Sequence, residues 1–168
     1  MARWRPMAVA DLETVVRVAD VVHVNYPEDP AVFADRLALF SPGCLIAEDD
    51  DGQILGYCLA HPGIVGDPPP LDTVLGAPPK AADCLYIHDV ALLPQARGRH
   101  LGVALARLME DVARAHGFDR IALTAVNNSD GFWGALGYVP QPCEKIASYG
   151  DATYRIKLLP SGRDNSQR

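Results

Sequence analysis

Apolar and polar positions in the first sixty residues change their period several times, and each change marks an element. Residues 3–7 predict a short edge strand that ends at Pro6. Residues 11–19 and 31–40 carry apolar side chains at helical spacing and predict two helices. Residues 44–48 and 54–60 are short β-type runs joined by an acidic, glycine-containing turn, which predicts a hairpin.

The most informative stretch is residues 85–117. Residues 85–93 are apolar, too short for most helices and followed by Pro94, so they predict a buried strand. An amphipathic helix is expected from residue 101 up to Gly117, which acts as its C′ residue. The apolar face of this helix is predicted to consist of Leu101, Ala104, Leu105, Leu108, Val112 and Ala115.

The loop between this strand and this helix combines glycine with arginine. Gly98 and Gly102 let a ligand approach the backbone, and the helix start presents unpaired N–H groups to it. Arg97 and Arg99 add positive charge, so a phosphate or pyrophosphate suits this loop. The alternative is an ordinary strand-to-helix turn with solvated arginines, and the loop alone does not decide between them.

The remaining elements complete an α/β pattern. Residues 121–126 predict a buried strand, which would pair in parallel with the strand at 85–93 through a right-handed crossover. A short helix is expected to end at residue 136, and residues 138–139 and 152–159 predict two further strands.

Two segments lack clear periodicity. Residues 61–83 are rich in proline and glycine, and we interpret them as a loop on the substrate side because they lead into the strand at residue 85. Residues 160–168 predict a disordered tail. The length of the chain then suits one domain over residues 1–159.

Composition narrows the functional classes. A formal net charge of −6 disfavours nonspecific nucleic-acid binding and favours cationic partners, which weakly indicates an amine substrate. No apolar run approaches the roughly 20 residues that cross a bilayer, and the N-terminus lacks a signal-peptide core, so we expect a cytoplasmic protein without membrane contact. The histidines are scattered, which gives a metal site no support. Reduced, mostly buried thiols are expected at Cys44, Cys58, Cys84 and Cys143.

The run V-A-L-L-P-Q-A-R-G-R-H-L-G-V-A-L closely resembles the acyl-CoA-binding motif of the GCN5-related N-acetyltransferase family, Arg/Gln-x-x-Gly-x-Gly/Ala. Two registers fit, one starting at Gln95 and one at Arg97, and both place His100 where the family has a small residue. The resemblance implies acetyl-CoA as cosubstrate, with loop amides at its pyrophosphate and strand backbone along its pantetheine arm. The cofactor residues that it implies here are Val90, Leu92, Leu93, Arg97, Gly98, Arg99, His100, Leu101 and Gly102.

A second segment, N-N-S-D-G-F-W-G-A-L-G-Y-V from Asn127, resembles another recurrent piece of the family. The resemblance implies that Asn127 lies near the CoA arm and that Phe132 packs nearby. Trp133 stands where many members have a tyrosine that protonates the leaving thiolate, and an indole cannot fill that role. The alternatives are a replacement acid, solvent or no acid at all, and Tyr138 and Tyr149 are candidate acids whose positions the sequence does not fix.

The strand at 85–93 carries the candidate base. Strict alternation would place Tyr86, His88, Val90 and Leu92 on one face, with Asp89 on the other. Tyr86 and His88 fall where serotonin-type members of the family carry a pair of histidines. Histidine has a suitable pKa, so His88 is the preferred base, directly or through water, and a hydrogen-bonded core histidine is the alternative.

These resemblances imply an α/β acyltransferase fold with a mixed, mostly antiparallel sheet, splayed near the CoA site and flanked by helices. The function expected from them is acetyl transfer from acetyl-CoA to a primary amine by direct attack. A noncatalytic acyl-CoA-binding regulatory module and a general nucleotide-phosphate binder are the alternatives. The acceptor and the oligomeric state stay open, with a homodimer among the options because dimers are common among relatives.

Overall fold

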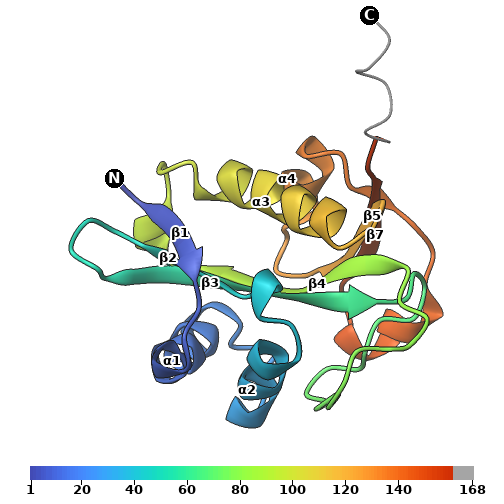
Figure 1. The fold of residues 1–168 in the computed structure, drawn as a ribbon, viewed down its shortest axis with the longest axis horizontal. Helices are drawn as coiled ribbons and strands as arrows, with labels where there is room; N and C mark the ends of the chain where they lie inside the picture. The colour runs from blue at the N-terminus through green and yellow to red at the C-terminus, as the bar shows by residue number, and fades with distance from the viewer. Residues whose placement is uncertain (161–168) are drawn as a thin grey trace, which may run out of the picture.

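The computed structural model describes residues 1–160, and its centre is one seven-stranded sheet (Figure 1). The strand order is β1-β2-β3-β4-β5-β7-β6, and every neighbouring pair is antiparallel except β4 with β5. The mixed, mostly antiparallel sheet is as predicted. The strands are β1 (Arg3–Pro6), β2 (Leu45–Glu48), β3 (Ile54–Gly63), β4 (Cys84–Leu92), β5 (Arg120–Ala125), β6 (Val139–Pro140) and β7 (Thr153–Leu158).

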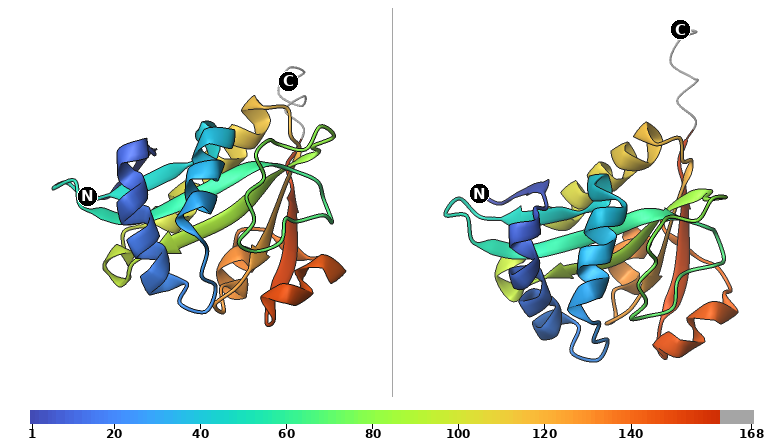
Figure 2. Two further views of the ribbon diagram at one scale, coloured as in Figure 1. Left: turned by 90° about the horizontal axis from the view of Figure 1, so that it is seen from below. Right: turned by 60° about the horizontal axis from the view of Figure 1, so that its bottom comes forward.

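Helices cover both faces of this sheet. The first two lie side by side on one face and the other two on the opposite face, as the views in Figures 1 and 2 agree. The α-helices are α1 (Leu12–Val22), α2 (Pro30–Leu39), α3 (Leu101–Ala115) and α4 (Asp130–Ala135). The short 3-10 helices are η1 (Val9–Asp11), η2 (Ser41–Gly43), η3 (Pro94–Ala96) and η4 (Glu144–Tyr149).

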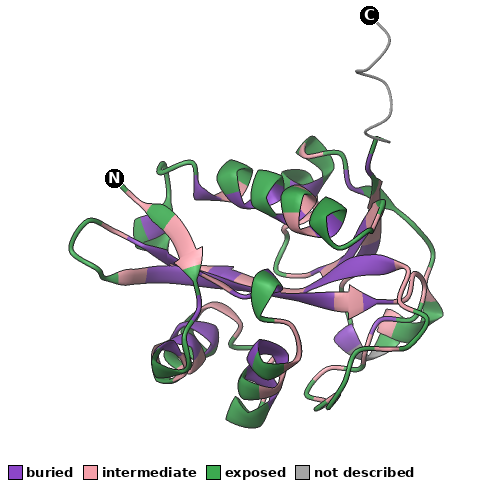
Figure 3. Cartoon of the chain, in the orientation of Figure 1, coloured by how far each residue is buried: buried purple, intermediate pink, exposed green. Residues whose placement is uncertain are grey.

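Each face of the sheet has its own apolar core. Val15 of α1 and Phe33 of α2 pack with Tyr57 of β3 on one face. Leu105 and Met109 of α3 pack on the other. The buried residues therefore follow the sheet and the inner side of each helix (Figure 3).

The predicted apolar face of α3 was partly wrong. Leu101 and Leu105 are buried as expected, but Leu108 is 37% exposed and Met109 is fully buried in its place. Of the remaining expected members, Val112 is partly buried against the core and Ala104 and Ala115 are exposed, while Ala106 and Ala113 are buried. A 3.6-residue period admits neighbouring stripes, and the contact with the sheet selects the one that contains Met109.

The predicted alternation along β4 was also wrong beyond Ile87. Leu59 of β3 lies opposite Asp89 and Ala60 lies opposite Ile87, so His88 is an extra residue in β4. Such a β-bulge inverts the alternation that follows it. Val90 therefore joins Ile87 on the α3 face, and Asp89 joins Tyr86 on the α1 and α2 face.

The order of the other elements confirms the sequence-based predictions, with bounds shifted by a few residues. The irregular segment is shorter than predicted because β3 extends to Gly63. Apart from Pro160, the tail predicted at 160–168 lies outside the described residues.

Candidate active site

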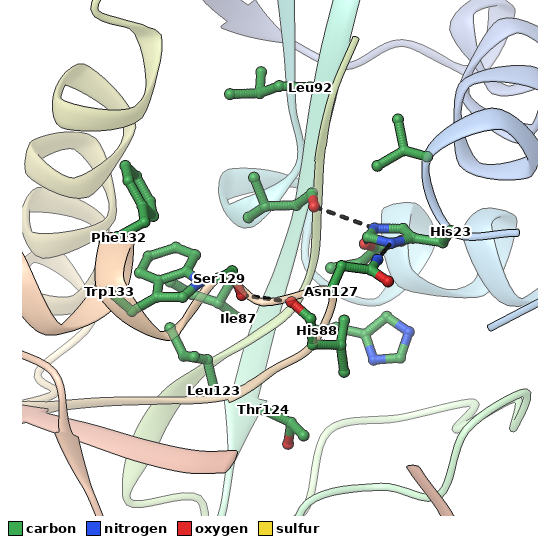
Figure 4. A pocket seen from close by; sticks show the side chains of 14 residues that line it. His23, Ile87, His88, Leu92, Leu123, Thr124, Asn127, Ser129, Phe132 and Trp133 are labelled. Carbon is green, nitrogen blue, oxygen red and sulfur yellow. Dashed lines mark hydrogen bonds and ion pairs between the residues drawn. The ribbon is translucent and has the colours of Figure 1, made fainter. Parts of the chain in front are cut away.

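The strands β4 and β5 pair only along part of their length. Their parallel register runs from Leu85 opposite Ile121 to Ile87 opposite Leu123 and stops there. Beyond it lies a cavity of about 250 Å³, which we call the splay cavity (Figure 4). Its lining consists of Val22, His23, Ile87, His88, Asp89, Val90, Leu92, Leu123, Thr124, Val126, Asn127, Ser129, Phe132 and Trp133.

The β4 edge along the splay cavity carries backbone groups that point away from β3. The carbonyl oxygen of Val90 lies 3.2 Å from His23 Nε2, so Val90 faces this edge. The N–H of Leu93 instead donates to the carbonyl of Leu55 in β3 at 2.8 Å. Consecutive strand residues direct their amide groups to alternate edges, so Leu92 shares the edge of Val90. The N–H groups of Val90 and Leu92 therefore face the splay cavity, and that of Leu93 does not.

The loop before α3 is fixed at both ends and exposed between them. Ala96 and Leu101 are buried in one apolar cluster, whereas residues 97–100 are exposed. The indole N–H of Trp4 donates to the carbonyl of Leu101 at 2.9 Å and fixes the start of α3. The first N–H groups of a helix have no partner within it, so this loop presents donors beside the two arginines that the sequence singled out.

Two residues of this loop have a left-handed backbone conformation. Gly98 has φ of 75° and His100 has φ of 59°. His100 occupies a small-residue position of the motif in both registers, and Gly98 does so in the register that starts at Gln95. The register that starts at Arg97 ends at Gly102, whose helical conformation suits the glycine or alanine of the pattern, so both registers fit the backbone. His100 thus adopts, at a cost of about 1–2 kcal/mol, a conformation that glycine adopts freely.

Gly102 sets the contact between α3 and α4. An added Cβ at Gly102 would lie 2.6 Å from the ring of Phe132, so only glycine allows this approach without movement of the ring. Phe132 packs edge-on against Trp133 with ring centres 5.0 Å apart, and Trp133 packs in the same way on Tyr138 at 5.2 Å. The aromatic wall of the splay cavity therefore rests on a residue of the loop-to-helix junction.

A hydrogen-bonded network crosses the splay cavity from α1 to the segment after β5. Asp89 accepts from the hydroxyl of Tyr57 and from His23 Nε2, the latter at 2.6 Å. Nδ1 of His23 lies 2.8 Å from Nδ2 of Asn127 (Figure 4). Nε2 faces two acceptors, Asp89 and the Val90 carbonyl, so Nε2 carries a proton.

The same network shifts the titration of His23. Burial alone would lower its pKa, but the hydrogen bond to Asp89 and the charge of that carboxylate outweigh burial, and the pKa is raised. A second proton on Nδ1 requires the Asn127 amide to turn its oxygen toward the ring, because an N–H cannot donate to Nδ2. His23 is therefore a group whose protonated form this network favours.

His88 forms a second buried pair. Its Nε2 lies 3.0 Å and 3.2 Å from the two carboxylate oxygens of Glu28, and the two side chains are 1% and 6% exposed. Nδ1 of His88 is buried without a hydrogen-bond partner in the described chain, and so are Nε2 of His61 and two guanidinium nitrogens of Arg36. The rings of His61 and His88 have centres 6.2 Å apart. Burial lowers the pKa of His61 to about 4, so this second histidine is neutral.

The three candidate tyrosines lie in different surroundings. Tyr86 is 2% exposed and its hydroxyl lies 2.8 Å from Thr124 Oγ1, so it reaches the splay cavity only through that threonine. Tyr138 is also 2% exposed, lies in the core beneath Trp133, and has a buried hydroxyl with no partner among the described residues. Burial raises the pKa of Tyr138 well above its usual value. Tyr149 lines a different cavity, described next.

A side cavity of about 30 Å³ adjoins the splay cavity and shares with it His23, His88, Asp89, Thr124 and Val126. Its other walls come from the α1–α2 segment, from residue 71 of the long irregular segment, and from η4. The substrate-side interpretation of that segment is consistent with this position. The residues that line only the side cavity are Tyr26, Glu28, Leu71 and Tyr149.

Sequence reasoning missed His23 and Glu28, which both belong to this site. They come from the end of α1 and the segment after it, 67 and 60 residues from their partners in β4. No local pattern marks either residue, and only the packing of α1 and the following segment against the sheet reveals them.

Other features of the described residues bear on the chemistry. No group of three or more His, Cys, Asp or Glu residues in this part of the chain is arranged to hold a metal ion. Within residues 1–160, no helix has both the length and the apolar character needed to cross a membrane. All four cysteines are free thiols, and Cys44, Cys58 and Cys84 are fully buried.

Comparisons with known proteins agree with this architecture. The family model described as the acetyltransferase (GNAT) family matches residues 11–138, which is more than half of the chain. The chain therefore belongs to the GNAT acetyltransferase family. A comparison with curated protein sequences finds no match.

Solved structures show the same fold at low sequence identity. Ard1 from Thermoplasma volcanium is 14% identical with a TM-score of 0.74, over 95% of this chain and 98% of that one. Naa50 of Arabidopsis thaliana, in complex with the bisubstrate analogue CoA-Ac-MVNAL, is 16% identical with a TM-score of 0.69, over 94% and 99%. The PaiA N-acetyltransferase of Thermoplasma acidophilum, in complex with coenzyme A, is 13% identical with a TM-score of 0.68, over 95% and 99%.

Proposed function

We propose that this protein transfers the acetyl group of acetyl-CoA to a primary amine by direct attack. The observation that carries the proposal is the splay cavity, where β4 leaves β5 and directs backbone N–H groups of Val90 and Leu92 into a space of about 250 Å³. Membership of the GNAT family supports the same activity. In this proposal, residues in and around the cavity bind acetyl-CoA, stabilise the oxyanion and transfer the protons of the reaction.

The residues present suit acetyl-CoA. Residues 97–100, with Gly98 and His100 in left-handed conformation, expose the loop beside the start of α3, which favours a pyrophosphate. Leu92 offers backbone groups along the open strand edge for the amides of a pantetheine arm. Acetyl-CoA would supply the thioester, and every other element of the chemistry comes from the chain.

The N–H of Val90 is placed to stabilise the oxyanion. The carbonyl of Val90 points into the cavity at its contact with His23, and the N–H of an extended residue points to the same edge. A fixed backbone donor that faces developing negative charge is worth several kcal/mol in such reactions, typically about 3–4. The bulge at His88 positions this donor, because it turns the strand at the point where the β4–β5 pairing ends.

His88 is our candidate for the base. A primary ammonium loses one proton before its nitrogen bonds to the acetyl carbon, and the carbon–sulfur bond then breaks. Glu28 holds Nε2 of His88 and leaves Nδ1 as the free acceptor, and the ring centre of His61 lies 6.2 Å from that of His88. Because Nδ1 is buried, a proton reaches it through water rather than by direct contact with the amine.

The leaving thiolate needs a proton that Trp133 does not provide. His23 lines the splay cavity, and the hydrogen bond and charge of Asp89 raise its pKa despite burial. We assign the proton donor to His23, since Tyr138 lies in the core and Tyr149 lines only the side cavity. After transfer, the proton taken from the amine nitrogen in the intermediate restores His23.

Transfer without a covalent enzyme intermediate fits the positions of the cysteines. Cys44, Cys58 and Cys84 are fully buried, and burial raises the pKa of Cys44 and of Cys84 to about 12. Such thiols are not nucleophilic at neutral pH. None of the four cysteines lines the splay cavity or the side cavity.

The test is the pH dependence of amine-dependent thiol release from acetyl-CoA. With His88→Gln, we expect kcat to fall and the pH–rate profile to change, because the general base is removed. An unchanged profile with a good substrate would remove His88 from the mechanism. Acetyl-CoA binding without turnover by any amine would favour the noncatalytic regulatory module instead.

A further inference from the structure

The side cavity is the part of the site that is positioned to choose the acceptor. It adjoins the splay cavity at His23, His88 and Asp89, so an amine held there lies beside the space assigned to the thioester. We infer that the acceptor is a small primary amine without a carboxylate, bound in this cavity beneath residues 64–83. This inference rests on the proposed acetyl transfer and adds the substrate class to it.

The chemistry of the walls favours an ammonium group. Glu28 and Asp89 bring two carboxylates to the cavity, and Tyr26 and Tyr149 bring two aromatic rings. An ammonium donates three hydrogen bonds and is attracted to both kinds of group. No lysine or arginine is among the described residues that line this cavity. A carboxylate on the acceptor would therefore face Glu28 and Asp89 with only histidines to oppose them.

Residues 64–83, which we call the covering segment, are tied to the α1–α2 side of the cavity. The N–H of Asp72 donates to Glu28 at 3.0 Å, and the Asp72 carboxylate accepts from the N–H of Asp29 at 2.6 Å. Further along, Asp35 accepts from the N–H groups of Leu75 and Gly76 at 3.0 Å and 2.9 Å. Glu28 thus holds His88 and the covering segment at the same time.

The covering segment is tied to the opposite side as well. The hydroxyl of Tyr149 donates to the carbonyl of Pro69 at 3.2 Å. The N–H of Gly66 donates to the hydroxyl of Tyr154 in β7 at 2.8 Å. The segment therefore spans from the α1–α2 side to the η4 side, and the loop lies between them in Figure 2. Leu71 lies between these attachments and lines the side cavity.

The volume of the side cavity and the covering segment limit the size of the acceptor. The side cavity measures about 30 Å³, against about 250 Å³ for the splay cavity. An acceptor that continues into a polypeptide would have to pass the covering segment, which its attachments at Asp72 and Tyr149 hold against this side of the cavity. A short alkylamine needs no such change, so peptide N-termini and lysine side chains of proteins are disfavoured.

The experiment compares three acceptors at saturating acetyl-CoA by thiol release. The acceptors are n-propylamine, β-alanine, which has a similar length and adds a carboxylate, and tetra-alanine amide. We expect kcat/KM for n-propylamine to exceed that for each of the others by about tenfold or more, since a misplaced like charge or a forced opening costs at least that factor. Equal or greater kcat/KM for β-alanine or the peptide would overturn the inference.

A variant tests the covering segment itself. Asp72→Ala removes the carboxylate that holds the N–H of Asp29, and we expect it to raise kcat/KM for tetra-alanine amide relative to n-propylamine. Asp111→Ala, at an exposed position of α3, is the matched control and should leave the ratio unchanged. An unchanged ratio in Asp72→Ala would count against the covering segment as a size filter.

Parallel calorimetry with acetyl-CoA separates the two levels of the argument. Absence of acetyl-CoA binding would contradict the proposed function. Acetyl-CoA binding together with no turnover of n-propylamine, or with preferred turnover of the peptide, would contradict only the inference about the acceptor.

Discussion

Replacing Asp89 by alanine is expected to lower the free energy of unfolding by about 3–5 kcal/mol, the usual cost of removing one member of a buried charged pair. Asp89 is 10% exposed and accepts from both Tyr57 and His23. Hydrogen bonds to charged groups are worth about 1.5–3 kcal/mol each, and the Tyr57 hydroxyl, on a fully buried side chain, would lose its partner. Asp89→Asn keeps one acceptor oxygen and should cost less, about 1–2 kcal/mol.

The pH dependence of this effect follows from the raised pKa of His23. Burial opposes the charged form, but the bond to Asp89 and its charge win, so folded His23 binds its proton more tightly than the unfolded chain does. The stabilisation is therefore complete below the unfolded pKa of about 6.5 and is lost as the pH rises through the higher folded value. In Asp89→Asn this loss should be much smaller, because the charge that raises the pKa is gone.

Urea unfolding from pH 6 to pH 9 measures both effects, with Glu13→Ala as the control. Glu13 pairs with Arg17 on the surface, and the two side chains are 84% and 67% exposed, so a shift below about 0.5 kcal/mol is expected. A double-mutant cycle with His23→Gln isolates the pair, and its coupling should decrease toward pH 9, where the neutral ring keeps only the hydrogen bond from Nε2. Wild-type stability in Asp89→Ala, or an equal pH slope in wild type and Asp89→Asn, would refute the reasoning.

Three further outcomes are expected from substitutions of glycines and of the loop arginines. Gly56→Ala should destabilise the protein by about 3 kcal/mol or more in urea unfolding, because its Cβ would lie 2.3 Å from the carbonyl oxygen of Ala91 in β4. The control Gly131→Ala, whose Cβ would have nothing within 4 Å, should be neutral or mildly stabilising. Equal urea midpoints of the two variants would contradict this expectation. Gly102→Ala should weaken acetyl-CoA binding about tenfold in calorimetry by displacing Phe132 toward the splay cavity, with Gly131→Ala again as control, and wild-type affinity would disprove the contact. Arg97→Ala with Arg99→Ala should weaken acetyl-CoA binding and reduce its salt dependence, and an unchanged salt dependence would exclude the loop from the phosphate site.

The centre of the fold was predictable because proline and glycine residues mark the ends of its secondary-structure elements. Pro94 and Gly117 bracket the loop and α3, and both boundaries lie within two residues of the predicted ones. The bulge at His88 was not predictable in the same way, because it depends on how β3 and β4 pair and not on the composition of β4. The buried stripe of α3 also depends on the sheet, since Leu108 and Met109 are equally apolar.

In the candidate site too, residues in contiguous motifs were predictable from the sequence, and residues brought together only by packing were not. The motif residues on β4, in the loop and on α4 were accessible to sequence reasoning because they are contiguous, and Ile87 to Val90, Leu92 and Phe132 do line one cavity. His23 and Glu28 were not accessible, because the residues they contact in β4 are far away in the chain. The roles of His88, Tyr86 and Tyr138 stay predictions until they are tested by substitution.

The most direct test of the central claim is a calorimetric titration of the intact protein with acetyl-CoA, with CoA as competitor and ATP and NAD as controls. We predict saturable acetyl-CoA binding that CoA displaces, little heat from ATP or NAD, and weaker acetyl-CoA binding in Gly102→Ala than in Gly131→Ala. Absence of binding to both acetyl-CoA and CoA, or equal affinity for ATP, would contradict the assignment of the splay cavity to an acyl-CoA.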